Sequence, residues 1–268
     1  LKLRQIHFYD TYVPIVPRKR ARIPYEQAVS MVCSALNPLG AAYSRTLKAG
    51  LQNRWVDRYE NQGKRSGAFS HGSYVGPTYI LLNYRNDTLD SVFTVAHEAG
   101  HSMHSYYSAR QQPFQYYRYT IFVAEVASTF NELLLSRYLL LRTRDRQTRA
   151  FLISREIDEI RGTLIRQVMF AEYEKRIHEI AEAGEPLTLD RMRGEYRKLL
   201  ELYFGPDFAL DEPLSIEGLR IPHFYDAFYV YKYATGLSAA ISLTEKVLKG
   251  SRNEREAYLR FLASGGSK

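Results

Sequence analysis

The chain has 268 residues, a formal net charge of +8, 45% hydrophobic residues and a single cysteine. This length and apolar content fit a globular protein with an ample core. One cysteine excludes an internal disulfide and fits a reducing compartment such as the cytoplasm. No stretch reaches the ~20 apolar residues that span a bilayer, and the first residues lack the apolar segment of a signal peptide. We therefore expect a cytoplasmic protein with no membrane segment.

The positive charge raises the alternative of a nucleic-acid-binding protein. Basic residues cluster at 18-RKRAR-22, which lies between two prolines and is typical of a surface loop. They recur at 142–149 and 191–198, where acids alternate with them on expected helices. Mixed charge of this kind usually marks a solvated helix face, and a basic rim could also attract acidic peptides. We expect no nucleic-acid partner; the alternative predicts binding that falls steeply with salt.

Most of the chain has helical patterning. Helices are expected at about 25–36, after 37-NPLG-40 to 54, at 87–108, 121–141, 146–183, 188–204 and 222–248. The best strand candidate is 78-TYILLNY-84, which with 66-SGAFSHGSY-74 could form a hairpin or part of a small sheet. No repeat or low-complexity linker interrupts this pattern. The sequence predicts one mainly α domain, with a small β-sheet or hairpin, over residues 1–268.

The segment 95-VAHEAGHSMHSY-106 contains an H-E-x-x-H motif on the third expected helix. His97 and His101 are four residues apart, so both imidazoles can bind one ion from the same helix face. Glu98 is rotated by about 100° and lies beside the ion, where a general base can take a proton from metal-bound water. The motif also occurs by chance, so it is only suggestive alone. His104 lies about 10 Å along the axis from His97, and we expect it to pack or to support the site.

A catalytic zinc site needs a third protein ligand. Glu125 lies on the next expected helix among apolar residues, where an unpaired carboxylate would be costly and a metal would compensate for it. Pro113 and the aromatic residues after it let the chain turn back, so the two helices could face each other in antiparallel fashion. Glu132, seven residues further on the same face, could accept the outer N–H of a ligand histidine. A surface position is the alternative for both carboxylates.

Several segments together resemble the thimet-oligopeptidase-like family of zinc metallopeptidases, and oligoendopeptidase F within it. They are HEAGHSMHSYYS, FVAEVASTFNE, 63-GKRSGAFS-70, 79-YILLNY-84 and 221-IPHFYDAFYVYKYATG-236, in family order over nearly the whole chain. The resemblance implies a zincin-like, mainly helical metallopeptidase catalytic domain. It implies one zinc per chain, bound by His97, His101 and Glu125, with Glu98 as the base. Family members carry a further N-terminal helical portion, so we expect this chain to be the C-terminal part of a longer architecture.

The resemblance also implies that a histidine and tyrosines of 221–236 stabilise the oxyanion that forms during peptide hydrolysis. We expect one helix here, on which Tyr225, Tyr229 and Tyr233 share a face because they are spaced by four. His223 and Tyr229 are the expected donors, with Tyr225 and Tyr233 in contact with substrate. An aromatic stripe in the core is the alternative.

The strand candidate 78–84, which contains Tyr79, has a second possible role. As an exposed edge strand it could pair with an extended peptide, and Gly72 and Gly76 would let the peptide backbone approach. An ordinary core strand is the alternative.

Taken together, these features predict a zinc-dependent oligoendopeptidase that hydrolyses internal bonds of short unstructured peptides through a zinc-bound water activated by Glu98. The restriction to short peptides is implied by the resemblance, since the family has a deep channel that excludes folded proteins. A family member that binds zinc without cleaving peptides is a further alternative. Against substitution as the cause of such inactivity, His97, Glu98, His101 and Glu125 are all present.

Overall fold

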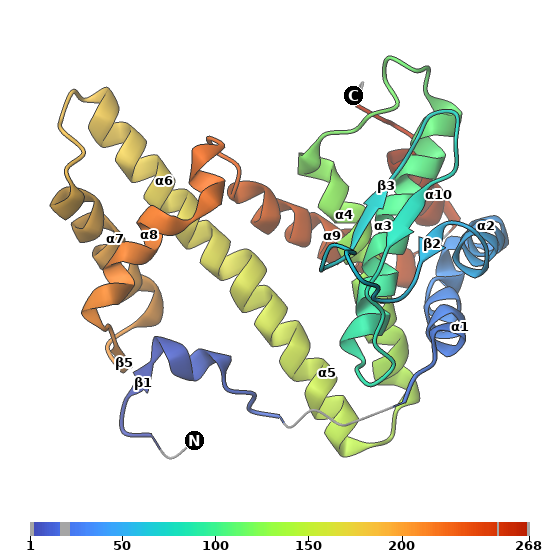
Figure 1. Cartoon of the computed structure of the whole chain (residues 1–268), viewed down its shortest axis with the longest axis horizontal. Coiled ribbons are helices and arrows are strands. Elements are labelled where there is room, and N and C mark those ends of the chain that lie inside the picture. The colour runs from blue at the N-terminus through green and yellow to red at the C-terminus, as the bar shows by residue number, and fades with distance from the viewer. Residues whose placement is uncertain (1–2, 17–21, 251, 267–268) are drawn as a thin grey trace. The chain divides into compact units, whose positions relative to one another are not determined.

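The computed structural model describes residues 3–16, 22–250 and 252–266 (Figure 1). It divides the chain into two compact units. The motif unit contains the described residues of 19–152 and 236–268, and the tyrosine unit contains those of 1–18 and 153–235. Helices dominate and the strands are short, which confirms the predicted mainly α fold with a small sheet. The single domain over 1–268 stays a prediction.

The motif unit consists of helices packed around one apolar core. Its elements include α1 (Tyr25–Ala35), α2 (Ala41–Gln52), α3 (Asp90–Gln111), α4 (Ile121–Arg142), the start of α5 (Arg146–Glu159), most of α9 (Tyr231–Lys249) and α10 (Arg252–Leu262). A 3-10 turn at Asn37–Leu39 and a left-handed Gly40 separate α1 from α2, as the sequence NPLG predicted. The helices expected at 25–36, 87–108 and 121–141 are confirmed within a few residues.

Three short strands form the sheet of the motif unit, in the order β2 (Val56–Asp57), β4 (Tyr79–Leu81), β3 (Phe69–His71). β3 and β4 are antiparallel, with Ser70 opposite Ile80, which matches the expected hairpin. Of the two alternatives for 78–84, the exposed edge strand is wrong, because β2 pairs in parallel with the other side of β4. β4 is therefore the central strand, and β3 lies at an edge.

The sheet packs on α3 through small side chains. Ser70 and Ser102 form a hydrogen bond of 2.7 Å between their Oγ atoms. A Cβ at Gly72 would lie 2.3 Å from the Cβ of Ser105. The absence of a side chain at Gly72 thus allows close packing of α3 beside β3, and a role of Gly72 in substrate binding stays a prediction.

The two helices that carry the candidate ligands, α3 and α4, run antiparallel and in close contact. Asn131 on α4 donates a hydrogen bond of 3.1 Å to the carbonyl of Ala96 on α3. One turn further along α3, an added Cβ at Gly100 would lie 2.5 Å from the carbonyl oxygen of Ala127. As the numbers rise on α3, those of the partners fall on α4, which is the predicted antiparallel arrangement. The absence of a side chain at Gly100 allows this close approach.

The tyrosine unit has its own smaller core. Its main elements are β1 (Ile6–His7), a 3-10 turn (Phe8–Tyr12), the end of α5, a π-helical turn (Ile160–Ile165), α6 (Arg166–Glu182), α7 (Leu189–Phe204), β5 (Phe208–Ala209) and α8 (Glu217–Arg220). β1 and β5 pair in parallel. The long helix expected at 146–183 thus changes type within its length but is not broken. Thr188 caps α7 by accepting a hydrogen bond from the backbone N–H of Arg191, at the predicted restart.

The helix expected at 222–248 is wrong in its first two turns. Residues Pro222–Tyr225 form one 3-10 turn, and α9 begins only at Tyr231. Between them Phe228 has a φ of +57°. A right-handed helix cannot continue through left-handed backbone, so the aromatic segment bends at this residue.

The charged surface agrees with the interpretation of solvated helix faces where the structure describes it. On α7, Arg193 contacts Glu212 and Arg197 contacts Glu201. Glu195, the partner of Lys198, is an exception because it is buried. The basic run 18-RKRAR-22 lies outside the described residues except for its last arginine. Among the described residues, every helix is too short or too polar to cross a bilayer.

The contact at Gly100 yields a first prediction. Replacing Gly100 by alanine places a methyl group against the α4 backbone, so the helices must separate, and we expect a loss of about 1–3 kcal/mol in the free energy of unfolding. Denaturant unfolding measures this loss. The matched control is Gly194→Ala on α7, where an added Cβ meets nothing within 4 Å and helix propensity favours alanine. Unchanged stability of Gly100→Ala would contradict this description of the α3–α4 contact.

Candidate metal centre

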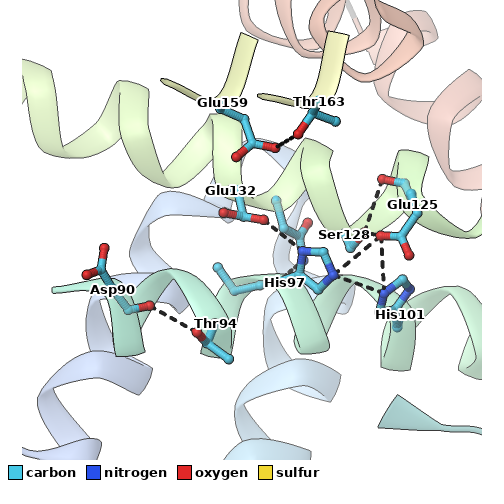
Figure 2. Close-up of polar contacts among 11 residues, drawn as sticks. Asp90, Thr94, His97, His101, Glu125, Ser128, Glu132, Glu159 and Thr163 are labelled. Carbon is cyan, nitrogen blue, oxygen red and sulfur yellow. Dashed lines mark hydrogen bonds and ion pairs between the residues drawn. The ribbon is translucent and has the colours of Figure 1, made fainter. Parts of the chain in front are cut away.

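His97 and His101 lie on one face of α3 and converge on one point (Figure 2). Their Nε2 atoms are 3.2 Å apart. The two rings are nearly perpendicular, with centroids 4.8 Å apart. Residues four apart on a helix share a side, so α3 alone brings the two imidazoles together.

Glu125 brings the third candidate ligand from α4. Its Oε2 lies 3.4 Å from Nε2 of His97 and 3.6 Å from Nε2 of His101. Zinc binds imidazole nitrogen and carboxylate oxygen at about 2.0–2.2 Å, which in a tetrahedron places two ligand atoms about 3.3 Å apart. The observed separations agree with that value, so the three residues fit a tetrahedral zinc with one position left for water or substrate. Within the described ranges, they are the one group of this type.

Two further side chains on α4 orient the candidate ligands. Glu132 accepts a hydrogen bond of 2.7 Å from Nδ1 of His97, which directs Nε2 of that ring toward the ligand centre. Ser128 donates a hydrogen bond of 2.9 Å to Oε2 of Glu125. The structure places Glu132 where the sequence predicted it. Ser128 was missed, although its spacing of three residues from Glu125 on a helix was a usable signal.

The charges of the candidate ligands are coupled. Burial opposes a charge on His97, but hydrogen bonds to Glu125 and Glu132 outweigh it and raise the pKa of His97 to about 10. Burial and the neighbouring His97 lower the pKa of His101 to about 4. Burial also opposes ionisation of Glu125, yet its contacts with the two histidines lower its pKa to about 2. The carboxylate of Glu125 is thus held in its ionised form next to the two imidazoles, where its negative charge favours a bound cation.

Glu98 is adjacent to His97 in sequence and is only 5% exposed. Its Oε2 makes no hydrogen bond to any described residue. Burial raises the pKa of Glu98 to about 7, and the carboxylates of Glu125 and Glu132 add to this effect while His97 opposes it. A carboxylate with such a pKa and an uncommitted oxygen is suited to exchanging protons near neutral pH.

His104 is not part of the ligand group. Its ring stacks on Tyr119, with centroids 3.6 Å apart and planes at 4°, and it also contacts Phe261. Burial, assisted by His101, lowers the pKa of His104 to about 3, so the ring packs in its neutral form. Tyr119, which the sequence did not single out, donates a hydrogen bond of 3.3 Å to the carbonyl of His101. It lies in a loop without periodic patterning, so no signal marked it.

The aromatic segment of the tyrosine unit forms a compact cluster. The hydroxyl of Tyr233 lies 3.2 Å from Nε2 of His223. The ring of Tyr229 stacks against His223 at 5.2 Å and lies 5.7 Å from the ring of Tyr233. Two phenols and one imidazole are thus grouped, and each can donate a hydrogen bond. We call His223, Tyr229 and Tyr233 the donor cluster.

Tyr225 and Tyr79 are the other tyrosines that were expected to contact substrate. Tyr225 is 88% exposed. The expected helix face shared by Tyr225, Tyr229 and Tyr233 is wrong, because the backbone bends at Phe228. Tyr79 lies on the central strand β4 and is 51% exposed. Substrate contacts of Tyr79 and Tyr225 stay predictions.

Comparison with known proteins places the chain among peptidases. Residues 1–268 match the family described as peptidase family M3. The chain is 46% identical over 267 residues to oligopeptidase PepF of Bacillus subtilis and 45% identical over 269 residues to an oligoendopeptidase F homolog of Borreliella burgdorferi. These matches cover 100% of the chain but 40% and 46% of the two relatives, so the chain spans less than half their length.

A solved structure gives the same result. Oligoendopeptidase-F from Enterococcus faecium matches with a TM-score of 0.73 and 33% identity, over 100% of this chain and 40% of that chain. The resemblance to oligoendopeptidase F that the sequence indicated is therefore confirmed. Because the family match extends over the ligand group on α3 and α4 as well as the donor cluster, the chain as a whole belongs to peptidase family M3.

Proposed function

We propose that this chain is the catalytic part of a zinc-dependent oligoendopeptidase that hydrolyses internal bonds of short unstructured peptides. The observation that carries the proposal is the convergence of His97, His101 and Glu125 at separations that suit one tetrahedral zinc. Similarity to proteins named oligopeptidase and oligoendopeptidase F supports peptides as substrates. The single cysteine supports a cytoplasmic location.

The residues of the site then have distinct roles. His97, His101 and Glu125 would hold one zinc ion per chain, which when bound would polarise the scissile carbonyl and make a water molecule more acidic. Glu98 takes a proton from the attacking water and delivers it to the leaving amine. Its burial and the uncommitted Oε2 support this role. Glu132 keeps the His97 ring in the orientation that binding requires.

The donor cluster would stabilise the oxyanion of the tetrahedral intermediate. A phenol or an imidazole can donate to that oxygen, and removal of one such donor typically costs about 10²–10³ in rate. His223 and Tyr229 are the proposed donors. The 3.2 Å contact between Tyr233 and His223 favours Tyr233 over Tyr225 as the tyrosine that assists them. Family membership supports this role.

The central experiment replaces Glu98 by glutamine. The amide keeps the size of the side chain but cannot take a proton, so zinc content is expected to stay at the wild-type level while kcat falls by about 10²–10⁴. Hydrolysis of a quenched-fluorescence peptide and elemental analysis of the same preparation measure both quantities. Loss of zinc in this variant would mean that Glu98 binds the metal or is structural, and retained activity would exclude it as the base.

Replacing Glu125 by alanine tests the third ligand. We expect one zinc per wild-type chain and little or none in the variant after dialysis, because two histidines alone hold the ion weakly. The control is Glu245→Ala, an exposed carboxylate on α9 that pairs with Lys249 and is expected to leave zinc content unchanged. Zinc at the wild-type level in Glu125→Ala would refute the three-residue site.

The contact between Glu132 and His97 generates another prediction. Alanine at position 132 removes the acceptor of the His97 ring and is expected to weaken zinc affinity about 10–100-fold. Glutamine, which keeps an acceptor oxygen, should weaken it less. Competition with a chelator of known affinity measures both variants. Equal affinities in the wild type and Glu132→Ala would show that this carboxylate does not support the ligand.

A further inference from the structure

The backbone bend in front of Tyr229 is unusual for the residue that forms it. Phe228 is the only non-glycine residue with positive φ in the part of the chain that the structure describes. A bulky side chain rarely adopts this left-handed conformation, because its Cβ then crowds the following carbonyl group. Such a conformation persists only when surrounding contacts hold it, and held strain of this type clusters at functional sites.

Helix α6 supplies the contacts that hold the bend. Glu174 is 2% exposed, and its Oε1 accepts a hydrogen bond of 2.6 Å from the backbone N–H of Phe228. Four residues further along α6, the ring of His178 packs on the ring of Phe228 at 4.7 Å. Four residues before Glu174, Phe170 contacts the ring of Phe224 at 5.9 Å. One face of α6 therefore contacts the aromatic segment before the bend, at Phe224, and at the bend itself, at Phe228.

The bend also determines the direction of the side chains that follow it. Val230 is 1% exposed and belongs to the core of the tyrosine unit. Tyr229, between Phe228 and Val230, instead has its ring against His223 of the donor cluster. Because Tyr229 is bonded directly to the strained residue, a change in the φ of Phe228 would rotate Tyr229 away from His223.

We propose that Glu174 is a positioning residue for the donor cluster. Its buried oxygen accepts the Phe228 amide, holds the left-handed bend and thereby sets the direction of Tyr229. This inference rests on the proposed function of the cluster as oxyanion donor. The hydrogen bond requires an acceptor oxygen at the distance that a glutamate side chain reaches, and it does not require a negative charge at that position.

Two substitutions of Glu174 distinguish the position of its acceptor oxygen from its negative charge. Glu174→Gln keeps the length and an acceptor oxygen, whereas Glu174→Asp keeps the charge but withdraws the oxygen by one methylene. With the zinc-loaded protein and a peptide substrate, we expect Glu174→Gln to retain most of the wild-type kcat. We expect Glu174→Asp to lose roughly 10–100-fold in kcat, with KM and zinc content little changed, because a donor misplaced by about 1 Å costs a factor of this order.

The relative kcat values of Glu174→Gln and Glu174→Asp decide whether the inference holds. An impaired glutamine variant beside an active aspartate variant would show that charge matters and would overturn it, and so would two fully active variants. The control is Glu179→Gln, on the same helix but exposed, for which wild-type kinetics are expected. Thermal unfolding of each variant shows whether it is folded at the assay temperature.

A second pair tests the bend without altering Glu174. Both Phe228→Asn and Phe228→Val remove the ring, but asparagine tolerates left-handed backbone and valine does not. We expect the valine variant to have the lower kcat at equal zinc content. Equal kcat in the two variants would overturn the inference even if Glu174→Asp does not fold.

A double-mutant comparison of Glu174→Asp with Tyr229→Phe distinguishes failure of this inference from failure of the proposed function. If Glu174 acts through Tyr229, then Glu174→Asp should slow the Tyr229→Phe background much less than the wild type. A slow Tyr229→Phe variant with an additive effect of Glu174→Asp would overturn the positioning role alone. Wild-type kcat in Tyr229→Phe would remove the oxyanion role of that tyrosine, and the positioning role with it.

Discussion

The close contact between α3 and α4 is the constraint on which the candidate metal site depends. Gly100 lets the backbone of α3 approach that of α4. The side-chain amide of Asn131 on α4 donates a hydrogen bond to the carbonyl of Ala96 on α3. At this separation the short side chain of Glu125 reaches both imidazoles of α3. If the two helices were further apart, Glu125 could not reach the two histidines. The H-E-x-x-H motif alone would then supply only two ligands.

Burial gives the same group its chemical character. Ionised side chains are unfavourable away from water unless opposite charges or hydrogen bonds compensate for them. Here Glu125 and Glu132 both contact His97, while Glu98 lies buried beside them with one oxygen that no described residue satisfies. The Glu125 carboxylate is held ionised by its contacts with His97 and His101, whereas burial raises the pKa of Glu98. The arrangement therefore favours a divalent cation at the centre and a basic carboxylate at its side, which are the two elements that peptide hydrolysis by a metal site needs.

Local spacing explains most of what the sequence could predict. The helical repeat alone pairs His97 with His101, and the apolar residues around Glu125 marked its carboxylate as unusual. The sheet order could not be predicted, because β2 has only two residues and shows no alternating pattern. The start of α9 could not be predicted either. At the bend, the backbone N–H of Phe228 donates to Glu174, which lies 54 residues earlier in the chain. The residue spacing within the aromatic segment gives no indication of that contact.

The central claim is that zinc binds to two imidazoles and one carboxylate at the α3–α4 contact. X-ray absorption at the zinc edge of the metal-loaded protein tests this claim most directly. The account predicts two imidazole nitrogens and oxygen ligands, all at about 2.0–2.2 Å, with no sulfur in the shell. A sulfur ligand at about 2.3 Å, which Cys33 would have to supply, or a shell with three imidazoles would contradict it.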